Sequence, residues 1–171
     1  MRVATLARVL GAGAGAAGSL GPIGVRFMVG GDGSGGGFAL VEHPMPPRAA
    51  AAPLHRHSRE DEYSYVLEGR VGAQLGEEVV FGTAGDPIFK PRGQWHTFWN
   101  AGNEPARLLK FVSPAGFERY FAAMTELPLA AGPPDLGAIA AVAARFGLEL
   151  DFASVPRLLQ DLGLTLGAGA P

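Results

Sequence analysis

The sequence contains no cysteine and only four histidines among its 171 residues. Without cysteine, the chain can form no disulfide bonds, thiolate nucleophiles or metal sites with sulfur ligands. Any metal ion would therefore have to be held by imidazole and carboxylate groups. The histidines are His43, His55, His57 and His96.

A strong excess of one charge is also missing, because 14 lysine and arginine residues are balanced by 16 aspartate and glutamate residues. The formal net charge of -2 leaves no basic surface of the kind that binds nucleic acid or anionic membranes. No hydrophobic run is long enough to span a bilayer. The uncharged stretch 9–25 contains too much glycine for a signal peptide. The sequence therefore predicts a cytoplasmic protein that binds neither nucleic acid nor membranes.

Glycine and proline, by contrast, are abundant, with 26 and 14 residues, and both disfavour the interior of helices. The hydrophobic fraction of 47% and the mean hydropathy of +0.16 nevertheless exclude an unfolded polar chain. An apolar chain with many turn residues is typical of a fold built from short strands.

These signals divide the chain into three parts. Residues 1–24 are predicted to contain an N-terminal strand or short helix at 1–10 and then a loop rich in glycine and alanine. The middle of the chain contains short apolar runs separated by turn signals, which predicts a barrel or sandwich of strands. Residues 116–171 are predicted to be a helical appendage.

Within these parts, strands at 25–29 and 38–43 flank a glycine-rich turn and predict a hairpin. The helical periodicity begins after Pro114. It predicts three short helices, over 115–127, 133–147 and 154–164.

One glycine-rich motif is interpreted as a chance match to a known pattern. Gly13 to Gly18 matches the G-x-G-x-x-G pattern of dinucleotide-binding loops. That pattern binds a pyrophosphate only where a helix begins directly after it. Gly21 and Pro22 follow and would end a helix within one turn, so no nucleotide site is expected.

Three histidines and one glutamate have the spacing of a metal site. His55 and His57 lie two residues apart, so on a strand both imidazoles point to one face. Glu62 follows within an acidic cluster, and His96 could add a ligand from another strand. Such a donor set accepts Fe, Mn, Ni, Cu or Zn, and the spacing leaves the choice open. His43 stands alone at the end of an apolar strand, which is more typical of a core or surface residue than of a ligand.

Two longer motifs enclose these residues. PLHRHSREDEYSYVLEGR gives H-x-H-x4-E-x6-G and ends with Gly69-Arg70. GDPIFKPRGQWHTFWN gives G-x5-P-x-G-x2-H-x3-N, from Gly85 to Asn100. Together they resemble the two signature motifs of the cupin superfamily, most closely those of small single-domain, quercetin-dioxygenase-like cupins. The departure is Ala49, where the first motif normally opens with glycine.

The resemblance implies both a fold and a ligand set. The fold is an all-β cupin double-stranded β-helix, or jelly-roll, barrel over residues 25–115, with short C-terminal helices. The ligands of one divalent transition metal would be His55, His57, Glu62 and His96.

Strand alternation extends the predicted site to a substrate pocket. Phe98 shares the face of His96, whereas Ser64 and Val66 share the face of Glu62, so these three residues are expected to line the pocket.

Other motif residues are expected to have structural roles. Trp95 and Trp99 point the opposite way from His96, which favours outer packing or a dimer surface. Gly69 matches a turn position that tolerates a positive φ, and Asn100 is expected to pair with the backbone.

The resemblance leaves the reaction open, because one fold supports many activities. The first hypothesis is a mononuclear-metal oxidoreductase, dioxygenase-like, that acts on a small organic substrate with Glu62 as metal ligand or catalytic base. The alternatives are a non-redox metal isomerase or lyase, and a small-molecule-binding protein without catalysis. A homodimer is also expected, because single-domain cupins often pair through their sheets and an exposed strand edge needs covering.

Overall fold

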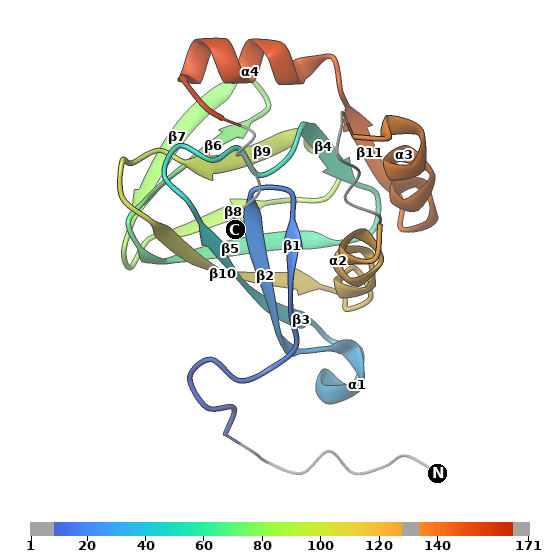
Figure 1. The fold of residues 1–171 in the computed structure, drawn as a ribbon. Coiled ribbons are helices and arrows are strands. Elements are labelled where there is room, and N and C mark those ends of the chain that lie inside the picture. Colours follow the sequence, from blue (N-terminus) through green and yellow to red (C-terminus); the bar gives the residue numbers. More distant parts are fainter. Residues whose placement is uncertain (1–8, 128–133, 166–171) are drawn as a thin grey trace.

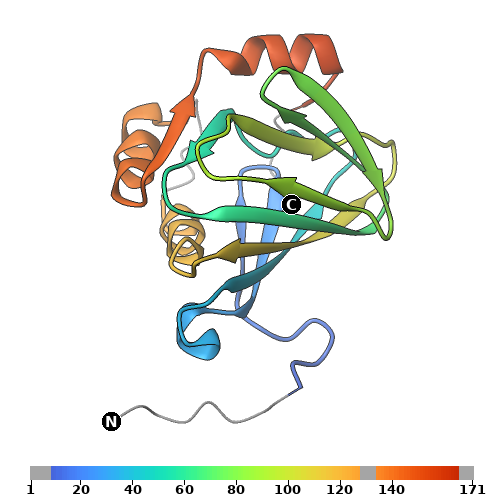
Figure 2. The ribbon, with the colours of Figure 1, turned by 180° about the vertical axis from the view of Figure 1, so that it is seen from behind.

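A computed structural model describes residues 9–127 and 134–165, which form eleven strands and four helices. The strands build two antiparallel sheets, and the helices lie around them (Figures 1 and 2). The N-terminal strand or short helix predicted at 1–10 falls almost entirely outside the described residues.

The first sheet has six strands in the order β1-β2-β3-β10-β5-β8. Neighbouring strands pair antiparallel, and the predicted hairpin is confirmed as β2 and β3. The strands are β1 (Ala17–Leu20), β2 (Ile23–Val29), β3 (Ala39–Met45), β10 (Ala106–Ser113), β5 (Asp61–Glu68) and β8 (Pro87–Lys90).

The second sheet has five strands in the order β11-β4-β9-β6-β7. It contains three of the four predicted metal ligands, on β4 and β9. The strands are β11 (Leu148–Asp151), β4 (Leu54–His57), β9 (His96–Asn100), β6 (Arg70–Leu75) and β7 (Glu78–Thr83).

A hydrophobic core forms between the inner faces of the two sheets. Met45, Val66 and Leu108 from the first sheet pack in one cluster with Val71 and Phe98 from the second. Met45, Val66 and Leu108 alternate with more exposed neighbours along their strands, as a half-buried strand requires. The predicted all-β jelly-roll class is confirmed by this arrangement of two facing sheets with short helices.

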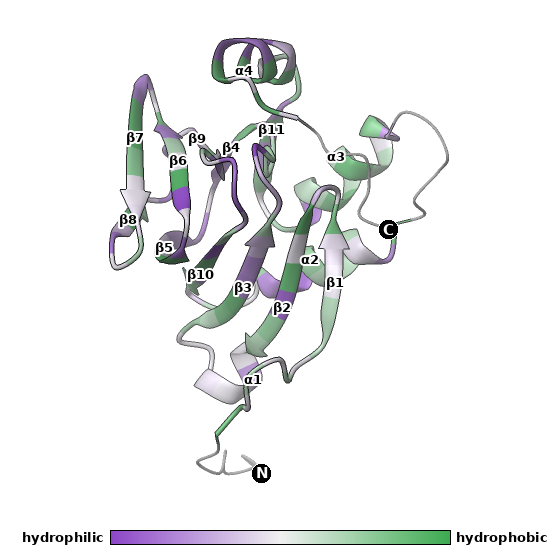
Figure 3. Ribbon diagram, turned by 60° about the vertical axis from the view of Figure 1, so that its left-hand side comes forward, coloured by the Kyte–Doolittle hydropathy of each residue, from purple (hydrophilic) through white to green (hydrophobic). Residues whose placement is uncertain are grey.

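The four helices are short and lie outside the sheets. They are α1 (Gly31–Ser34), α2 (Glu118–Thr125), α3 (Leu136–Arg145) and α4 (Ser154–Leu162). In Figure 3, α3 is largely green, and α4 alternates between green and purple, as an amphipathic surface helix does. The side chain of Asp135 caps α3 by accepting a hydrogen bond from the amide of Ala138.

Strand β1 was not expected, because its sequence lies in the predicted loop of glycine and alanine. It pairs with β2 over four residues at the edge of the first sheet. Small side chains hide the two-residue alternation that marks a strand, so the pattern offered no signal here. Since a strand follows Gly15, the chain lacks the helix start that dinucleotide binding requires.

Strand β11 was also not expected, because it lies between two predicted helices. Leu148 pairs with His57 and Leu150 with His55, so β11 is hydrogen-bonded along the strand that carries two of the candidate ligands. Four residues are too few for a reliable alternation pattern. The sheets therefore include strands from the N-terminal and C-terminal parts, and the division at residues 24 and 115 stays a prediction.

Trp99 lies on the outer face of the second sheet, as its alternation with His96 predicts. It is buried under the end of the chain in a cluster with Ala50 and Leu164. The ring covers Gly72 of the neighbouring strand, where a Cβ atom would lie 2.3 Å from Cε2 of Trp99. Helix α4 therefore packs on the back of the ligand-bearing sheet.

No helix in the described part of the chain is long and apolar enough to cross a membrane. The cytoplasmic location stays a prediction.

Candidate metal centre

Four side chains from three strands converge at one end of the interior. His55 and His57 come from β4, Glu62 from β5 and His96 from β9. One ligand atom from each lies within 4.8 Å of the others, and all four side chains are buried. The structure therefore brings the four predicted residues together, and their role as metal ligands stays a prediction.

Strand pairing produces this convergence. His55 and His96 are direct partners in the antiparallel pair of β4 and β9. Their ring centroids lie 4.4 Å apart. His57 lies two residues further along β4 and its ring is parallel to that of His96. The turn before His96 includes Gly93, whose φ of 78° favours glycine.

Backbone carbonyls fix the orientation of two imidazoles. Nδ1 of His55 donates to the carbonyl of Pro53 at 2.8 Å, and Nδ1 of His96 donates to the carbonyl of Gln94 at 3.0 Å. Each Nε2 is then the unprotonated nitrogen, with a lone pair free for a metal ion. Such hydrogen bonds are the usual outer contacts of metal-binding histidines.

Burial keeps these imidazoles neutral. It lowers the pKa of His55 well below the usual value, and the neighbouring rings of His96 and His57 act in the same direction. Burial also lowers the pKa of His96 to about 3. Neutral imidazole is the form that binds a metal ion, so the site is set for coordination at neutral pH.

Glu62 is fully buried and has two lysine partners. The ammonium of Lys90 contacts Oε1, and Nζ of Lys110 lies 3.0 Å from Oε2. Burial would raise the pKa of Glu62, but the ammonium groups of Lys110 and Lys90 outweigh it and hold this pKa well below its usual value. Glu62 is therefore a carboxylate and can act as an anionic ligand.

The donor set fits a divalent metal ion. Nε2 of His57 and Nε2 of His96 are buried and have no hydrogen-bond partner among the described residues. Buried polar atoms without partners are unfavourable, and a cation bound between the two rings would satisfy both. Three imidazole nitrogens and one carboxylate oxygen suit a first-row transition metal and leave coordination positions for other ligands.

Phe117 and Glu60 flank His57 on its outer side. The ring of Phe117 meets the His57 imidazole edge-on, with centroids 4.3 Å apart. A carboxyl oxygen of Glu60 lies 3.8 Å from Nδ1 of His57, which is too far for a hydrogen bond. Phe117 precedes α2, so a residue from the C-terminal part supports a candidate ligand.

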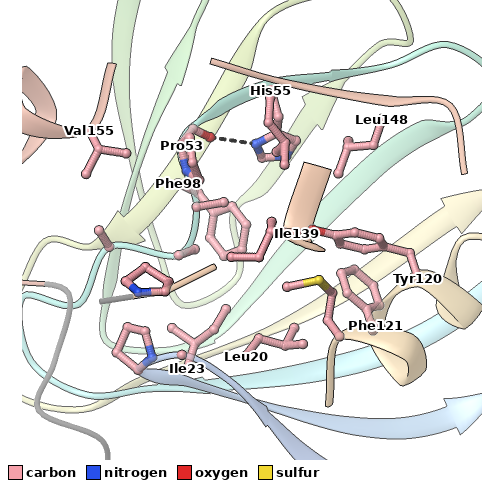
Figure 4. Close-up of a pocket in the computed structure, with 18 of the residues that line it drawn as sticks. Leu20, Ile23, Pro53, His55, Phe98, Tyr120, Phe121, Ile139, Leu148 and Val155 are labelled. Atoms are coloured by element: carbon pink, nitrogen blue, oxygen red, sulfur yellow. Dashed lines mark hydrogen bonds between the residues drawn. The ribbon is translucent and has the colours of Figure 1, made fainter. Parts of the chain in front are cut away.

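A cavity of about 420 Å³ opens from the cluster, and His55, Glu62 and Lys110 reach it. Most of its lining is apolar and comes from both sheets and the C-terminal helices. Figure 4 shows labelled side chains around the same space, among them Leu20, Ile23, Phe98, Phe121, Ile139, Leu148 and Val155. A volume of this size is typical of small-molecule sites.

The predicted pocket residues lie in three environments. Phe98 lines the cavity. Ser64 accepts a hydrogen bond from Nζ of Lys90 at 2.6 Å, and Val66 belongs to the hydrophobic core. Neither Ser64 nor Val66 lines this cavity, and their contact with a substrate stays a prediction.

Sequence reasoning missed the two buried lysines. Lys90 follows Ile88 on the inner face of β8, and Lys110 lies between Leu108 and Val112 on the inner face of β10. The ammonium of Lys110 lies 4.2 Å from the centroid of the Phe98 ring. The alternation of each strand contained this signal, because a lysine occupies a position whose neighbours in register are apolar.

His43 is buried and lies outside the metal cluster, whereas the sequence left open whether it is a core or a surface residue. Nδ1 donates to the carbonyl of Gly24 at 2.8 Å, and the ring meets Phe121 edge-on. Burial and the charge of Lys110 lower the pKa of His43 to about 3, so the imidazole is neutral. It also lines the cavity, which the sequence did not indicate.

Gly69 and Asn100 behave as predicted. Gly69 has a φ of 78°, and a Cβ atom there would lie 2.9 Å from Cα of Ala106. The Asn100 amide donates to the carbonyls of Met45, Pro46 and Glu104.

A family model described as a cupin domain matches residues 42–112, which include all four residues of the cluster. Among curated proteins, the tetracenomycin polyketide synthase protein TcmJ of Streptomyces glaucescens is 33% identical over 86 residues. The match covers 48% of this chain and 58% of that relative, so it spans less than two thirds of the relative's length.

Solved structures resemble the fold at lower identity. KdgF from a Halomonas species is 18% identical with a TM-score of 0.51, over 57% of this chain and 84% of that one. A predicted oxalate decarboxylase from Thermotoga maritima is 22% identical with a TM-score of 0.51, over 54% and 80%. A Klebsiella pneumoniae protein with a double-stranded β-helix domain is 22% identical with a TM-score of 0.50, over 57% and 82%. At these identities the likeness shows the fold alone.

Proposed function

Because the chain belongs to the cupin superfamily, we propose that it is a mononuclear-metal enzyme, dioxygenase-like, that acts on a small and largely apolar organic molecule. The observation that carries this proposal is the cluster of His55, His57, Glu62 and His96 at the inner end of an apolar cavity. The ligand geometry supports metal binding, and the cavity supports access of a second molecule to the metal.

The roles of the ligands differ by their exposure. His57 and His96 do not line the cavity, whereas His55 and Glu62 do, and His55 is the more exposed of these two at 5%. We therefore propose that the substrate approaches the metal from the side of His55. Phe98 lies beside this approach, and the apolar walls would exclude water from the reacting atoms.

A bound metal ion would supply Lewis acidity and, for a redox-active element, one-electron chemistry. The chain itself supplies groups that hold and move protons. Glu62 is a carboxylate in contact with the ammonium of Lys110, and both reach the cavity. Glu62 could accept a proton from an acidic carbon or hydroxyl of the substrate, and Lys110 could stabilise the negative charge that results.

Two measurements on the purified protein test this function. Elemental analysis should find about one transition-metal ion per chain, as a set of four protein ligands implies, and His96→Ala should lose it. The metal-loaded protein should then consume oxygen with an enolic, phenolic or diketone substrate. His43→Leu, which alters a buried histidine outside the cluster, is the matched control and should retain the metal.

Non-redox chemistry is the second candidate, and the contact between Glu62 and Lys110 favours it. A carboxylate and an ammonium group that face one cavity can transfer protons without oxygen, as an isomerase or lyase requires. Turnover of the same substrate under argon would select this candidate and reject the oxygenase. A ligand that raises the melting temperature and is never converted would instead select a binding protein without catalysis.

We further propose that the protein forms a homodimer through the outer face of the first sheet. Tyr63 and Phe89 are about half exposed and stack on each other there, with ring centroids 4.8 Å apart. Exposed aromatic pairs of this kind are common at protein interfaces. Sedimentation velocity should give the mass of two chains, and Phe89→Glu should shift it to that of one chain.

A further inference from the structure

The buried charges beside the candidate ligands do not balance. The ammonium groups of Lys90 and Lys110 both contact the single carboxylate of Glu62, and all three side chains are almost completely buried. Two positive charges therefore surround one negative charge. A buried charge without a counter-charge is strongly unfavourable. The excess positive charge would therefore stabilise one further anion bound in the interior.

The nearest other buried carboxyl groups face elsewhere. Glu60 approaches Nδ1 of His57 rather than either ammonium, and Glu42 pairs with Arg26 and Arg107 on the outer side of the first sheet. Among the described residues, Glu62 is therefore the carboxylate that contacts the two lysines.

The two lysines differ in their access to the cavity. Nζ of Lys90 donates hydrogen bonds to Glu62 and to the hydroxyl of Ser64, and Lys90 does not line the cavity. Lys110 lines the cavity together with Glu62 and His55, and its ammonium lies against the ring of Phe98. Lys110 is thus the cationic group that a bound molecule can reach.

A divalent metal ion on the four ligands would increase the imbalance, and in this respect the inference rests on the proposed function. The metal would raise the net charge of the buried group from one to three positive charges. Glu62 would then be shared among a metal ion and two ammonium groups. An anionic ligand that contacts both the metal and Lys110 would offset part of this charge.

The rest of the cavity is apolar, which limits the ligand to one polar end. Its walls include Leu20, Phe121, Ile139, Leu148 and Val155, and they leave a volume of about 420 Å³. These five wall residues lie outside residues 42–112, whereas the four candidate ligands and Lys110 lie inside them. The end of the cavity beside the candidate metal ligands is thus formed by residues that the family model matches. The apolar end is formed by segments that the family model does not match.

From these contacts we propose that the cavity binds an amphipathic anion, that is, a carboxylate, enolate or phenolate on an apolar ring or hydrocarbon body. The anionic oxygen lies between Lys110 and the metal position beside His55. The apolar body extends towards β11 and the helices. Lys110 determines which charged group of the ligand binds, and the wall residues determine which apolar body the cavity accepts.

A pair of probes with the same apolar body tests this inference. Binding of 2-naphthoate and of the uncharged 2-naphthylmethanol is measured by isothermal titration calorimetry, once with the zinc-loaded protein and once after treatment with EDTA. In both forms, the carboxylate should bind about 10- to 100-fold more tightly, as a charged hydrogen bond implies. Equal affinity for the two probes would overturn the proposal without the use of any variant.

Three lysine variants then identify the group that binds the anionic end of the ligand. Lys110→Met should abolish the preference for the carboxylate, whereas Lys90→Met removes the other ammonium on Glu62 and should retain it. Lys110→Arg keeps the charge and should retain most of the preference, which guards against a misfolded methionine variant. Equal loss in both methionine variants would overturn the assignment to Lys110. If Lys110→Met still prefers the carboxylate when zinc is bound but not after EDTA, the metal is the group that binds the carboxylate. That result would also overturn the assignment to Lys110.

Failure of this inference is distinguishable from failure of the proposed function. The EDTA-treated protein reports on Lys110 without any metal, whereas metal content and turnover report on the enzyme. Suppose that elemental analysis finds no metal and the protein still binds naphthoate more tightly than the alcohol. The proposed function would then be wrong, and the proposed anion site would stand.

Discussion

His55 faces His96 across the pair of β4 and β9, and each imidazole is held by a hydrogen bond to a carbonyl two residues earlier in the chain. Both rings are therefore oriented before any metal binds. A preorganised site of this kind binds its metal with little rearrangement.

Metal binding should stabilise the fold measurably. A ligand that binds the folded state alone adds about 2.7 kcal/mol to the free energy of unfolding when its concentration is 100 times Kd. EDTA should therefore lower the melting temperature of the wild-type protein, and added metal should restore it. In His96→Ala the melting temperature should be the same with EDTA and with metal. A variant that still responds to metal would remove His96 from the ligand set.

Acid should destabilise the metal-free protein through His43. Burial gives this imidazole a pKa of about 3 in the folded state, whereas the ordinary value is 6.5. The unfolded chain therefore binds more protons between these two values, so stability is full above pH 6.5 and falls as the pH decreases towards 3. The contribution of one such group is at most about 1.4 kcal/mol per pH unit.

Urea denaturation of the EDTA-treated protein between pH 7 and pH 5 measures this effect. The free energy of unfolding should depend less on pH in His43→Leu than in the wild type. Identical pH dependence in the two proteins would mean that His43 is not buried as a neutral group.

Gly72→Ala should destabilise the protein. The added Cβ atom would lie 2.3 Å from the Trp99 ring, which is itself enclosed by Leu164 and its neighbours and cannot move aside. We expect a loss of about 1–3 kcal/mol in the free energy of unfolding, the range for an overpacked interior. Gly11→Ala, at a site with no atom within 4 Å, is the control and should have little effect.

Phe117→Ala should weaken both stability and metal binding. The ring is 2% exposed, packs in the cluster below α2 and contacts His57. Truncation of a buried phenylalanine lowers the free energy of unfolding by about 3–5 kcal/mol. The loss of its contact with His57 should also raise the Kd for the metal.

Phe81→Ala, on β7 of the second sheet and outside the proposed dimer face, is the matched truncation at the surface, where the ring is 50% exposed. It should lower the free energy of unfolding by at most about 1 kcal/mol and leave the metal affinity unchanged. Equal effects of the two truncations would contradict the packing of Phe117 against the metal cluster.

The sequence predicted strands between residues 25 and 115, the convergence of the four candidate ligands and the role of Asn100, but neither β1 nor β11. These follow from local patterns, namely strand alternation and the spacing of the two motifs. The neighbours of the ligands could not be predicted in the same way. Lys90 and Lys110 reach Glu62 only because β8 and β10 lie on opposite sides of β5. That placement depends on strand order, which spacing along the chain does not define.

The residues that form the walls of the cavity could not be predicted from the sequence either. Leu148 and Leu150 belong to a strand of four residues that exists because β4 offers it hydrogen-bond partners. Leu20 belongs to β1, whose small side chains give no alternation. In both cases the tertiary partner determines the structure, and the local preference of the segment is weak.

The pairing of β4 has a consequence for the order in which the site can form during synthesis. Its partners are β9 and β11, which lie much later in the chain, and β11 is among the last described elements. Contacts between distant segments form slowly because a long loop must close first. We infer that the strand bearing His55 and His57 acquires its outer neighbour only after nearly all of the described chain has left the ribosome.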